Sequence, residues 1–292
     1  MEEKQIDTRE SSPKAPVDSA EEVSERMSEV ELCGNISEYI GLTHANIRAV
    51  NSSQEEIDRL RTHLVIGGNG LEQVRSSARR LEQTDLARIR PGVDQLGGSF
   101  RSLSTAIQAE VAGVRGYLSK FNISGIDPAL NTLHELASPD KLKQRIGEAL
   151  QITDPKQRQV ALERIKRSFL DIVTTVSKTA ISGKDQAVGF RGSCGENSDN
   201  LAGCSLSANR VSGAIEGLQS GGKLLENQRG IVHSISDGYE PVRGHIRTFR
   251  ANIDTPVGRV AFKLQSIDDD SAAIAKRVIA YFVDIQAGET VA

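Results

Sequence analysis

A series of residues that recurs at alternating steps of three and four runs from Val211 to Ile253. A repeat that averages about 3.5 residues keeps one stripe of a helix facing a neighbouring helix, as in coiled coils. The stripe is interrupted only at Gly222, which has no side chain, and at Arg229, which is charged. We expect a structural interaction seam formed by Val211, Ile215, Leu218, Leu225, Val232, Ile235, Val242, Ile246, Phe249 and Ile253. This pattern predicts long packed helices and indicates no particular chemistry.

Similar stripes occupy most of the remaining chain. One runs from Ile36 to Leu64, another from Val93 to Phe121, and a third from Val260 to Ile285. No period-two alternation reaches the length of a useful strand. Aromatic residues make up only 4% of the 292 residues, which suits thin helix–helix seams better than a thick core. The sequence therefore predicts an all-α fold with no β-sheet, in which long amphipathic or coiled-coil helices form an elongated antiparallel bundle.

Glycine and proline suggest where the helices end. The glycines of Gly67-Gly68-Asn69-Gly70 predict a break, and Gly238 with Pro241 predicts a kink that leaves the repeat in phase. Pro91 is expected to begin a helix, because proline suits the first turn. Asp–Pro or Ser–Pro pairs predict three further helices, near 128–137, 139–151 and 155–181.

These signals divide the chain into four parts. Residues 1–18 are predicted to be a disordered acidic tail, since the first 32 residues hold ten acidic and four basic side chains. A long amino-terminal helical arm (19–122), a node of short helices (123–183) and a long carboxyl-terminal arm (184–288) follow. The simplest arrangement places the two arms side by side and antiparallel. The alternative is a shorter, folded-back bundle, which the glycine and proline breaks permit.

Many glycines fall inside the predicted helices, where each costs up to about 1 kcal/mol relative to alanine. They suggest either close approach of neighbouring helices or arms that bend and rearrange. They are Gly92, Gly97, Gly98, Gly113, Gly116, Gly213, Gly217, Gly221 and Gly222.

No catalytic, cofactor-binding or metal site is predicted. Cys194 and Cys204 lie on a backward extension of the seam, where a free cysteine packs as a small apolar side chain. The five histidines include no two at the spacing of three to five that a helical metal site uses. No Gly-x-Ser-x-Gly sequence indicates a nucleophile elbow.

The node contains the one notable charge cluster, with eight basic and four acidic side chains between 139 and 169. A basic surface of this kind can contact an acidic partner, including the acidic amino-terminal segment of the chain itself. The alternative is an ordinary solvated helix surface, because acidic residues interleave. The basic residues are Lys141, Lys143, Arg145, Lys156, Arg158, Arg164, Lys166 and Arg167.

The expected function is that of a non-enzymatic coiled-coil protein acting as a structural or protein-interaction scaffold or adaptor. One alternative is a conformation-switching helical effector or a pore-forming virulence component. Another is a small-ligand or enzymatic site within the node, where His134 is the only histidine. Expected partners are proteins, including further copies of the chain. A net charge of −3 does not favour nucleic acid.

No apolar run is long enough to span a membrane, and no secretory signal is evident, so we expect no integral membrane insertion. The expected location is the cytoplasm, with signal-independent export as the alternative.

Overall fold

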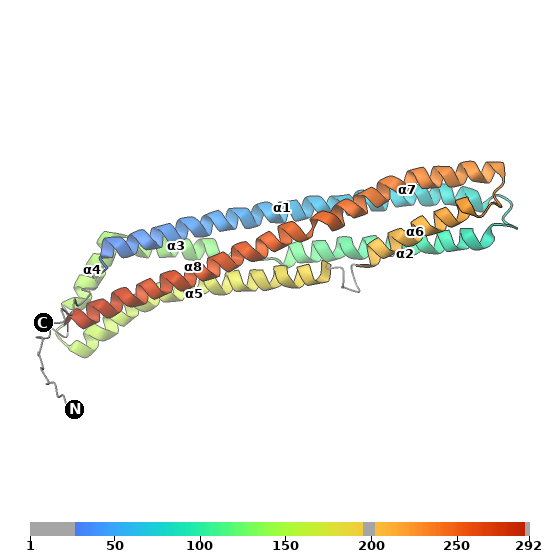
Figure 1. The fold of residues 1–292 in the computed structure, drawn as a ribbon. Coiled ribbons are helices and arrows are strands. Elements are labelled where there is room, and N and C mark those ends of the chain that lie inside the picture. Colours follow the sequence, from blue (N-terminus) through green and yellow to red (C-terminus); the bar gives the residue numbers. More distant parts are fainter. Residues whose placement is uncertain (1–26, 195–201, 290–292) are drawn as a thin grey trace, which may run out of the picture.

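The computed structural model describes residues 27–194 and 202–289, and these residues form helices joined by short connections (Figure 1). No strand occurs among them, which confirms the all-α prediction. The predicted acidic tail (1–18) lies outside the described residues. The helices are α1 (Glu29–Glu82), α2 (Arg90–Lys120), α3 (Ile126–Leu136), α4 (Pro139–Leu150), α5 (Pro155–Cys194), α6 (Ala202–Ser220), α7 (Glu226–Asn252) and α8 (Asp254–Glu289).

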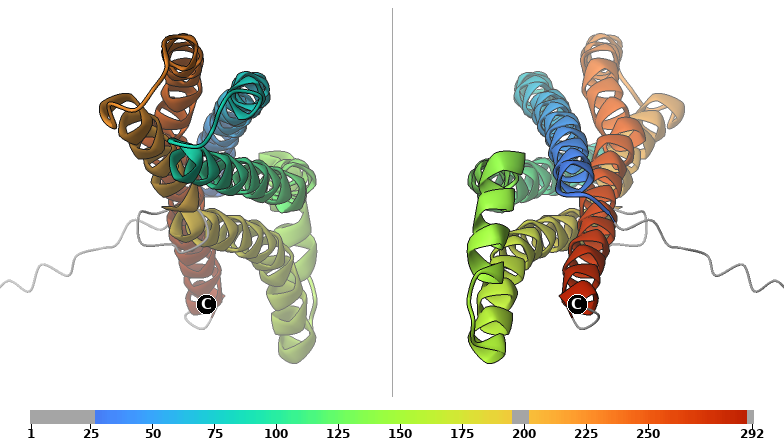
Figure 2. Two further views of the ribbon diagram at one scale, coloured as in Figure 1. Left: turned by 90° about the vertical axis from the view of Figure 1, so that its right-hand side faces the viewer. Right: turned by 90° about the vertical axis from the view of Figure 1, so that its left-hand side faces the viewer.

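The helices are arranged in four tracks that lie side by side along the elongated molecule (Figures 1 and 2). The first track is α1 alone, the second is α2 followed by α3, the third is α5 followed by α6, and the fourth is α7 followed by α8. Helix α1 packs on α7 and α8 on one side and on α2 and α3 on the other. Helices α5 and α6 close the bundle against α8 and α2, and α4 crosses one end. Neighbouring tracks run in opposite directions.

The arrangement of the arms differs from the simplest prediction. The range 19–122 contains two helices, α1 and α2, which pack against each other as a hairpin. The chain therefore folds back within this range, as the alternative prediction described. Helices α4 and α5 begin at the predicted prolines, Pro139 and Pro155, whereas α3 begins at Ile126, two residues before Pro128. Helix α5 continues to Cys194 and packs along α8 as one of the long members.

The predicted break at Gly67–Gly70 does not occur, because α1 is continuous from Glu29 to Glu82. The buried positions keep their three-and-four spacing through the glycines, with Leu64, Gly67, Leu71 and Val74 in the interior. A Cβ atom at Gly70 would lie 3.0 Å from Cγ2 of Val242 on α7. The glycines thus allow close approach of the neighbouring helix, and this tertiary packing outweighs their poor helix propensity.

The seam from Val211 to Ile253 is not one helix. Helix α6 ends at Ser220, Gly222 adopts a left-handed conformation with φ of +61°, and α7 begins at Glu226. The left-handed conformation suits glycine because it has no side chain to clash. Gln228, and not Arg229, is buried just beyond this turn, whereas the predicted positions from Val232 to Ile253 are buried as expected. Pro241 lies inside α7, which continues past it to Asn252.

Among the described residues, two tracks pass from one helix to the next at the same level, near mid-length, which we call the waist (Figure 1). Here α2 gives way to α3, and α7 meets α8 at Ile253, while α1 passes through unbroken; α5 ends and α6 begins on either side of this level, and residues 195–201 between them lie outside the described part of the chain. Three contacts at this level join all four tracks. Nε2 of Gln54 on α1 donates to Oη of Tyr117 on α2 at 2.7 Å, and the Tyr117 ring stacks on Phe190 of α5 with the ring centroids 4.3 Å apart. Arg191 of α5 donates to both carboxylate oxygens of Asp254 on α8, at 2.6 Å and 2.7 Å.

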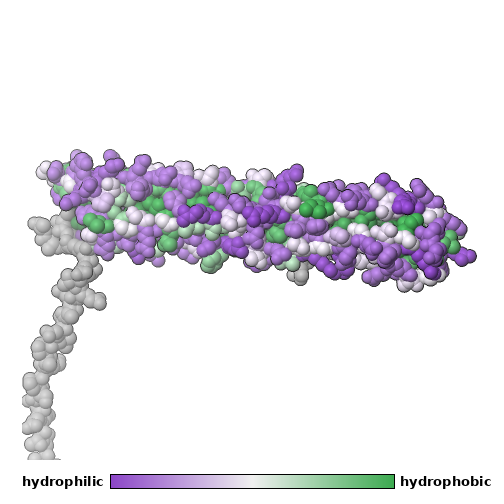
Figure 3. All heavy atoms as spheres, turned by 90° about the horizontal axis from the view of Figure 1, so that it is seen from above, coloured by the Kyte–Doolittle hydropathy of each residue, from purple (hydrophilic) through white to green (hydrophobic). Residues whose placement is uncertain are grey.

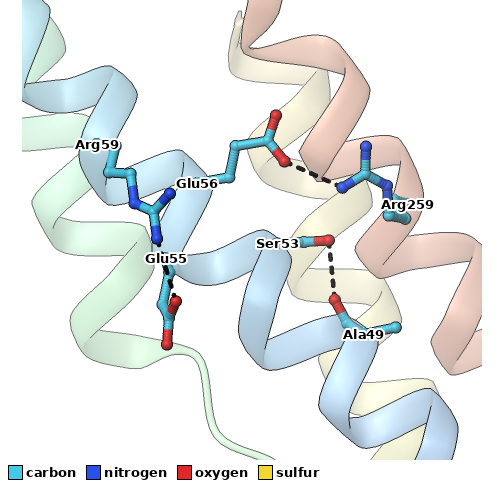
Figure 4. A network of polar contacts seen from close by, with 6 residues as sticks. All are labelled: Ala49, Ser53, Glu55, Glu56, Arg59 and Arg259. Carbon is cyan, nitrogen blue, oxygen red and sulfur yellow. Dashed lines mark hydrogen bonds and ion pairs between the residues drawn. The ribbon is translucent and has the colours of Figure 1, made fainter.

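An ion pair between α1 and α8 lies beside these contacts (Figure 4). Arg259 Nη1 donates to Oε2 of Glu56 at 3.0 Å. Ser53, one turn before Glu56, is buried and donates to the carbonyl oxygen of Ala49 at 2.9 Å, so its hydroxyl is satisfied within α1. The small serine side chain leaves room for the neighbouring helices at the waist.

Candidate functional site

The predicted seam residues are used inside the chain. Nine of the ten are buried, packed in the interior that α6, α7 and α8 share with α1 and α2. Leu225 is the exception, since it caps the start of α7 and is 45% exposed. A partner that binds this chain in the described conformation must therefore use the outer surface of the bundle.

The predicted basic residues lie on α4 and on the first turns of α5. Arg158 and Lys166 make contacts within the chain, to the carbonyl oxygen of Ile152 at 3.1 Å and to Glu163 respectively. Arg145 is half-buried. The exposed remainder is Lys141, Lys143, Lys156, Arg164 and Arg167.

A surface groove of about 780 Å³ lies along α5 within the node. Its described lining comes from α5 alone and mixes charges of both signs, including Lys156, Arg164, Glu163 and Asp171. His134 is exposed on α3 and is not among these lining residues. The described residues that line this groove therefore do not form a cluster of acid, base and nucleophile that would support an enzymatic site in the node.

A second groove, of about 550 Å³, lies between α1 and α2 on the outside of the bundle. Its apolar lining includes Leu64, Ile107 and Val111, and Glu72 and Arg115 provide opposite charges. Volumes of this size are typical of sites that bind small molecules or inserted side chains. Gly68 on α1 helps to shape the groove, because a Cβ atom at this position would lie 3.3 Å from Cγ2 of Ile107. We call it the α1/α2 groove.

A buried carboxyl group lies in the core between α2, α6 and α7. Glu110 is completely buried, and its Oε1 atom is 3.9 Å from Nη1 of Arg250 on α7. The thiol of Cys204, also fully buried, lies against the carboxyl group from α6. Neither carboxyl oxygen accepts a hydrogen bond of ordinary geometry, and a thiol is only a weak donor. The site therefore holds an incompletely compensated acid in an apolar interior.

Burial raises the pKa of Glu110 to about 7, and the positive charge of Arg250 opposes this rise only in part. Burial and the neighbouring Glu110 also raise the pKa of the Cys204 thiol well above its usual range. A thiol held in its neutral form is a poor nucleophile and a poor metal ligand. The cluster thus offers a group that titrates near neutral pH, and it offers no reactive thiol.

Two histidines from different helices meet between α1 and α7. The Nδ1 atoms of His63 and His245 are 3.1 Å apart, and the ring centroids are 5.4 Å apart. Both side chains are half-buried. One ring must donate its Nδ1 hydrogen to the Nδ1 lone pair of the other, so the neutral pair shares a single hydrogen bond.

Other titratable groups make weaker arrangements. His44 lies 3.8 Å from Asp127, and His233 lies 3.4 Å from Asp237, both at the surface. Cys33 is buried near the start of α1, while the side chain of Cys194 lies outside the described residues. Within the described residues, no group of three or more His, Cys, Asp or Glu side chains is placed to hold a metal ion.

Sequence reasoning missed Glu110 and the histidine pair for different reasons. The apolar stripe predicted for α2 passes through Val111, whereas a strict three-and-four count from Val93 reaches Glu110 and then Val114. That count places a charged residue in the core. His63 and His245 are 182 residues apart in sequence, so no local spacing connects them.

In the described part of the chain, no helix combines the length and apolar character needed to cross a bilayer. No protein-family model, curated protein or solved structure matches the chain at a significant level.

Proposed function

We propose that this chain is a non-enzymatic helical scaffold or adaptor that binds protein partners on its outer surface. The α1/α2 groove is the observation on which the proposal rests. It offers an apolar floor with charged edges on a long helical body, and such a groove suits an amphipathic helix or extended segment that inserts apolar side chains. The seams that predicted long helices are occupied within the chain, so they do not provide this surface.

Further features of the surface fit an extended binding body. The face seen from above is mainly hydrophilic, with hydrophobic patches along its length (Figure 3). Several large apolar side chains are exposed on different helices, including Phe262 at 66% and Val160 at 59%. The exposed basic residues on α4 and α5 add a contact for an acidic segment. Scattered apolar residues are common on any surface, so the groove remains the principal argument.

A pair of neighbouring positions on α2 allows a sharp test. Gln108 lines the groove, whereas its exposed neighbour Ala109 is not among the lining residues and points about 100° away around the helix axis. A photo-crosslinking residue is placed at each position in turn, and the partner captured at Gln108 is then purified. We expect crosslinking at Gln108 and little at Ala109.

The same purified partner allows a direct binding measurement. Ala112 is exposed and lines the groove, so Ala112→Arg fills the groove without disturbing the core. We expect this variant to weaken binding at least ten-fold. Equal crosslinking at both α2 positions, or full binding by Ala112→Arg, would contradict the proposal.

A conformation-switching protein is the second candidate, and Glu110 favours it. An acid that titrates near pH 7 inside the core weakens the folded bundle when it ionises. Small-angle scattering at pH 6 and pH 8 separates the candidates, because a static scaffold keeps one maximum dimension while a switching protein changes it. A shape that is independent of pH would remove the argument for the switch.

A further inference from the structure

We propose that His63 and His245 form an interhelical binding site for a late first-row transition metal ion, with Zn²⁺ as the probe. The proposal is independent of the function proposed above. It rests on the position of two imidazole nitrogens, Nδ1 of each ring, which face one another across the contact between α1 and α7 at 3.1 Å.

The separation of the two nitrogens fits one shared ion. Zinc binds histidine nitrogen at about 2.0–2.1 Å, and a tetrahedral angle then places two ligand nitrogens about 3.3 Å apart. The observed 3.1 Å lies within a few tenths of an ångström of that value. Both rings must also turn, because the Nδ1 atoms now point at each other and their lone pairs have to converge on the ion. Imidazole is a preferred ligand of zinc, copper and nickel.

The packing of α1 against α7 fixes the backbone positions from which the two histidine side chains extend. His63 is followed directly by the buried Leu64, and His245 is followed directly by the buried Ile246. One turn after His63 lies Gly67, where a Cβ atom would be 3.5 Å from Cβ of His245. The backbone of α1 thus passes close to His245, which restricts its ring to the space beside His63.

The remaining coordination positions belong to water. Among residues 27–194 and 202–289, no third His, Cys, Asp or Glu side chain joins these two to make a group of three. Both rings are half-buried, so solvent reaches the pair. The site is therefore open, in contrast with the closed four-ligand sites that serve purely structural roles.

The proton balance of binding is simple. In the neutral pair one Nδ1 carries a hydrogen and the other accepts it. For both Nδ1 atoms to bind the ion, the donor ring must move that hydrogen to its own Nε2 through solvent, so no net proton is released. When either ring carries a second proton, binding must displace it, and the affinity falls as the pH is lowered.

Isothermal titration of the full reduced chain with Zn²⁺ tests the site. We expect one ion per chain, with affinity at least ten-fold weaker in His63→Ala and in His245→Ala. Two other surface histidines, each beside an aspartate, serve as matched controls, so His44→Ala and His233→Ala should bind as the wild type does. Absence of binding, or binding that survives both His63→Ala and His245→Ala, would overturn the proposal.

A spectroscopic measurement on the wild-type chain identifies the atoms without relying on variants. Imidazole ¹⁵N NMR distinguishes Nδ1 from Nε2, and Zn²⁺ should shift the Nδ1 resonances of His63 and His245 together. A shift confined to Nε2 resonances, or to other histidines, would refute the site even if the chain binds zinc elsewhere.

Discussion

Replacing Glu110 with glutamine should remove a pH-dependent weakness from the core. The wild-type carboxyl group is fully buried, and its pKa is raised from 4.5 to about 7. The folded state therefore retains a proton that the unfolded state loses at lower pH. By linkage, the contribution of this group to stability is highest below pH 4.5, declines as the pH rises from 4.5 towards 7, and then levels off. Glu110→Gln keeps nearly the same shape but does not titrate.

The size of the effect follows from the two pKa values. One pKa unit corresponds to about 1.4 kcal/mol of free energy, so ionised Glu110 costs the folded bundle about 3 kcal/mol. The advantage of the variant over the wild type should grow by about this amount between pH 4.5 and pH 8. Burying the neutral amide adds an offset that is the same at every pH, and the change with pH is therefore the quantity to measure.

Urea unfolding followed by circular dichroism at several pH values gives this difference curve. Asp94→Asn is the matched control, because Asp94 is an exposed carboxylate on the same helix. The difference for Glu110→Gln should change with pH by more than the difference for this control does. A constant difference for Glu110→Gln would refute the reasoning, since it would mean that the buried carboxyl group does not titrate between its unfolded and folded pKa values.

Three further substitutions test the packing and the polar contacts, each by the same unfolding measurement. Gly183→Ala should destabilise the fold by about 1–3 kcal/mol, because the new Cβ would lie 3.0 Å from Ile123 and 3.1 Å from Leu264. Gly189→Ala on the same helix meets nothing within 4 Å and should stabilise the fold by about 0.5–1 kcal/mol. Equal effects of the two substitutions would contradict this account. A buried 2.7 Å hydrogen bond joins the hydroxyls of Tyr39 on α1 and Ser271 on α8. We therefore expect Tyr39→Phe and Ser271→Ala to lower stability by about 1 kcal/mol each and to be non-additive when combined. Strict additivity would show that the bond contributes nothing. The buried side chain of Gln228 donates two hydrogen bonds to the connection between α1 and α2. Gln228→Ala should therefore lower stability by about 2 kcal/mol and speed amide hydrogen exchange in that connection. Unchanged exchange there would contradict this prediction.

The helical fold could be predicted because its core positions repeat so regularly. The stripe from Ile36 to Leu64 and the Asp–Pro and Ser–Pro pairs predict helices where the structure has them. The turn at Gly222 was missed because the apolar repeat resumes almost in phase on its far side. Helices α6 and α7 each present such a stripe to the interior, and the stripe alone does not reveal the reversal between them.

The candidate sites were much less predictable. The α1/α2 groove depends on how closely two helices approach at Gly68, and a sequence pattern does not give that distance. The histidine pair depends on the register of α1 against α7, which many distant contacts set together. The burial of Glu110 could have been predicted, because a strict three-and-four count along α2 places Glu110 at a core position.

The waist is the level at which we expect the elongated molecule to bend most easily. Among the described residues, the track of α2 and α3 is broken at this level and α7 meets α8 there at Ile253, whereas α1 is unbroken. We therefore expect α1 to contribute most to the bending stiffness at mid-length. A transverse load on either end would concentrate its strain at this level. Gly67, Gly68 and Gly70 of α1 lie beyond the joint, where the neighbouring members are unbroken. We therefore expect the waist to bend more readily than the segments on either side, and Ser53→Pro, which would interrupt α1 at this level, to increase that bending.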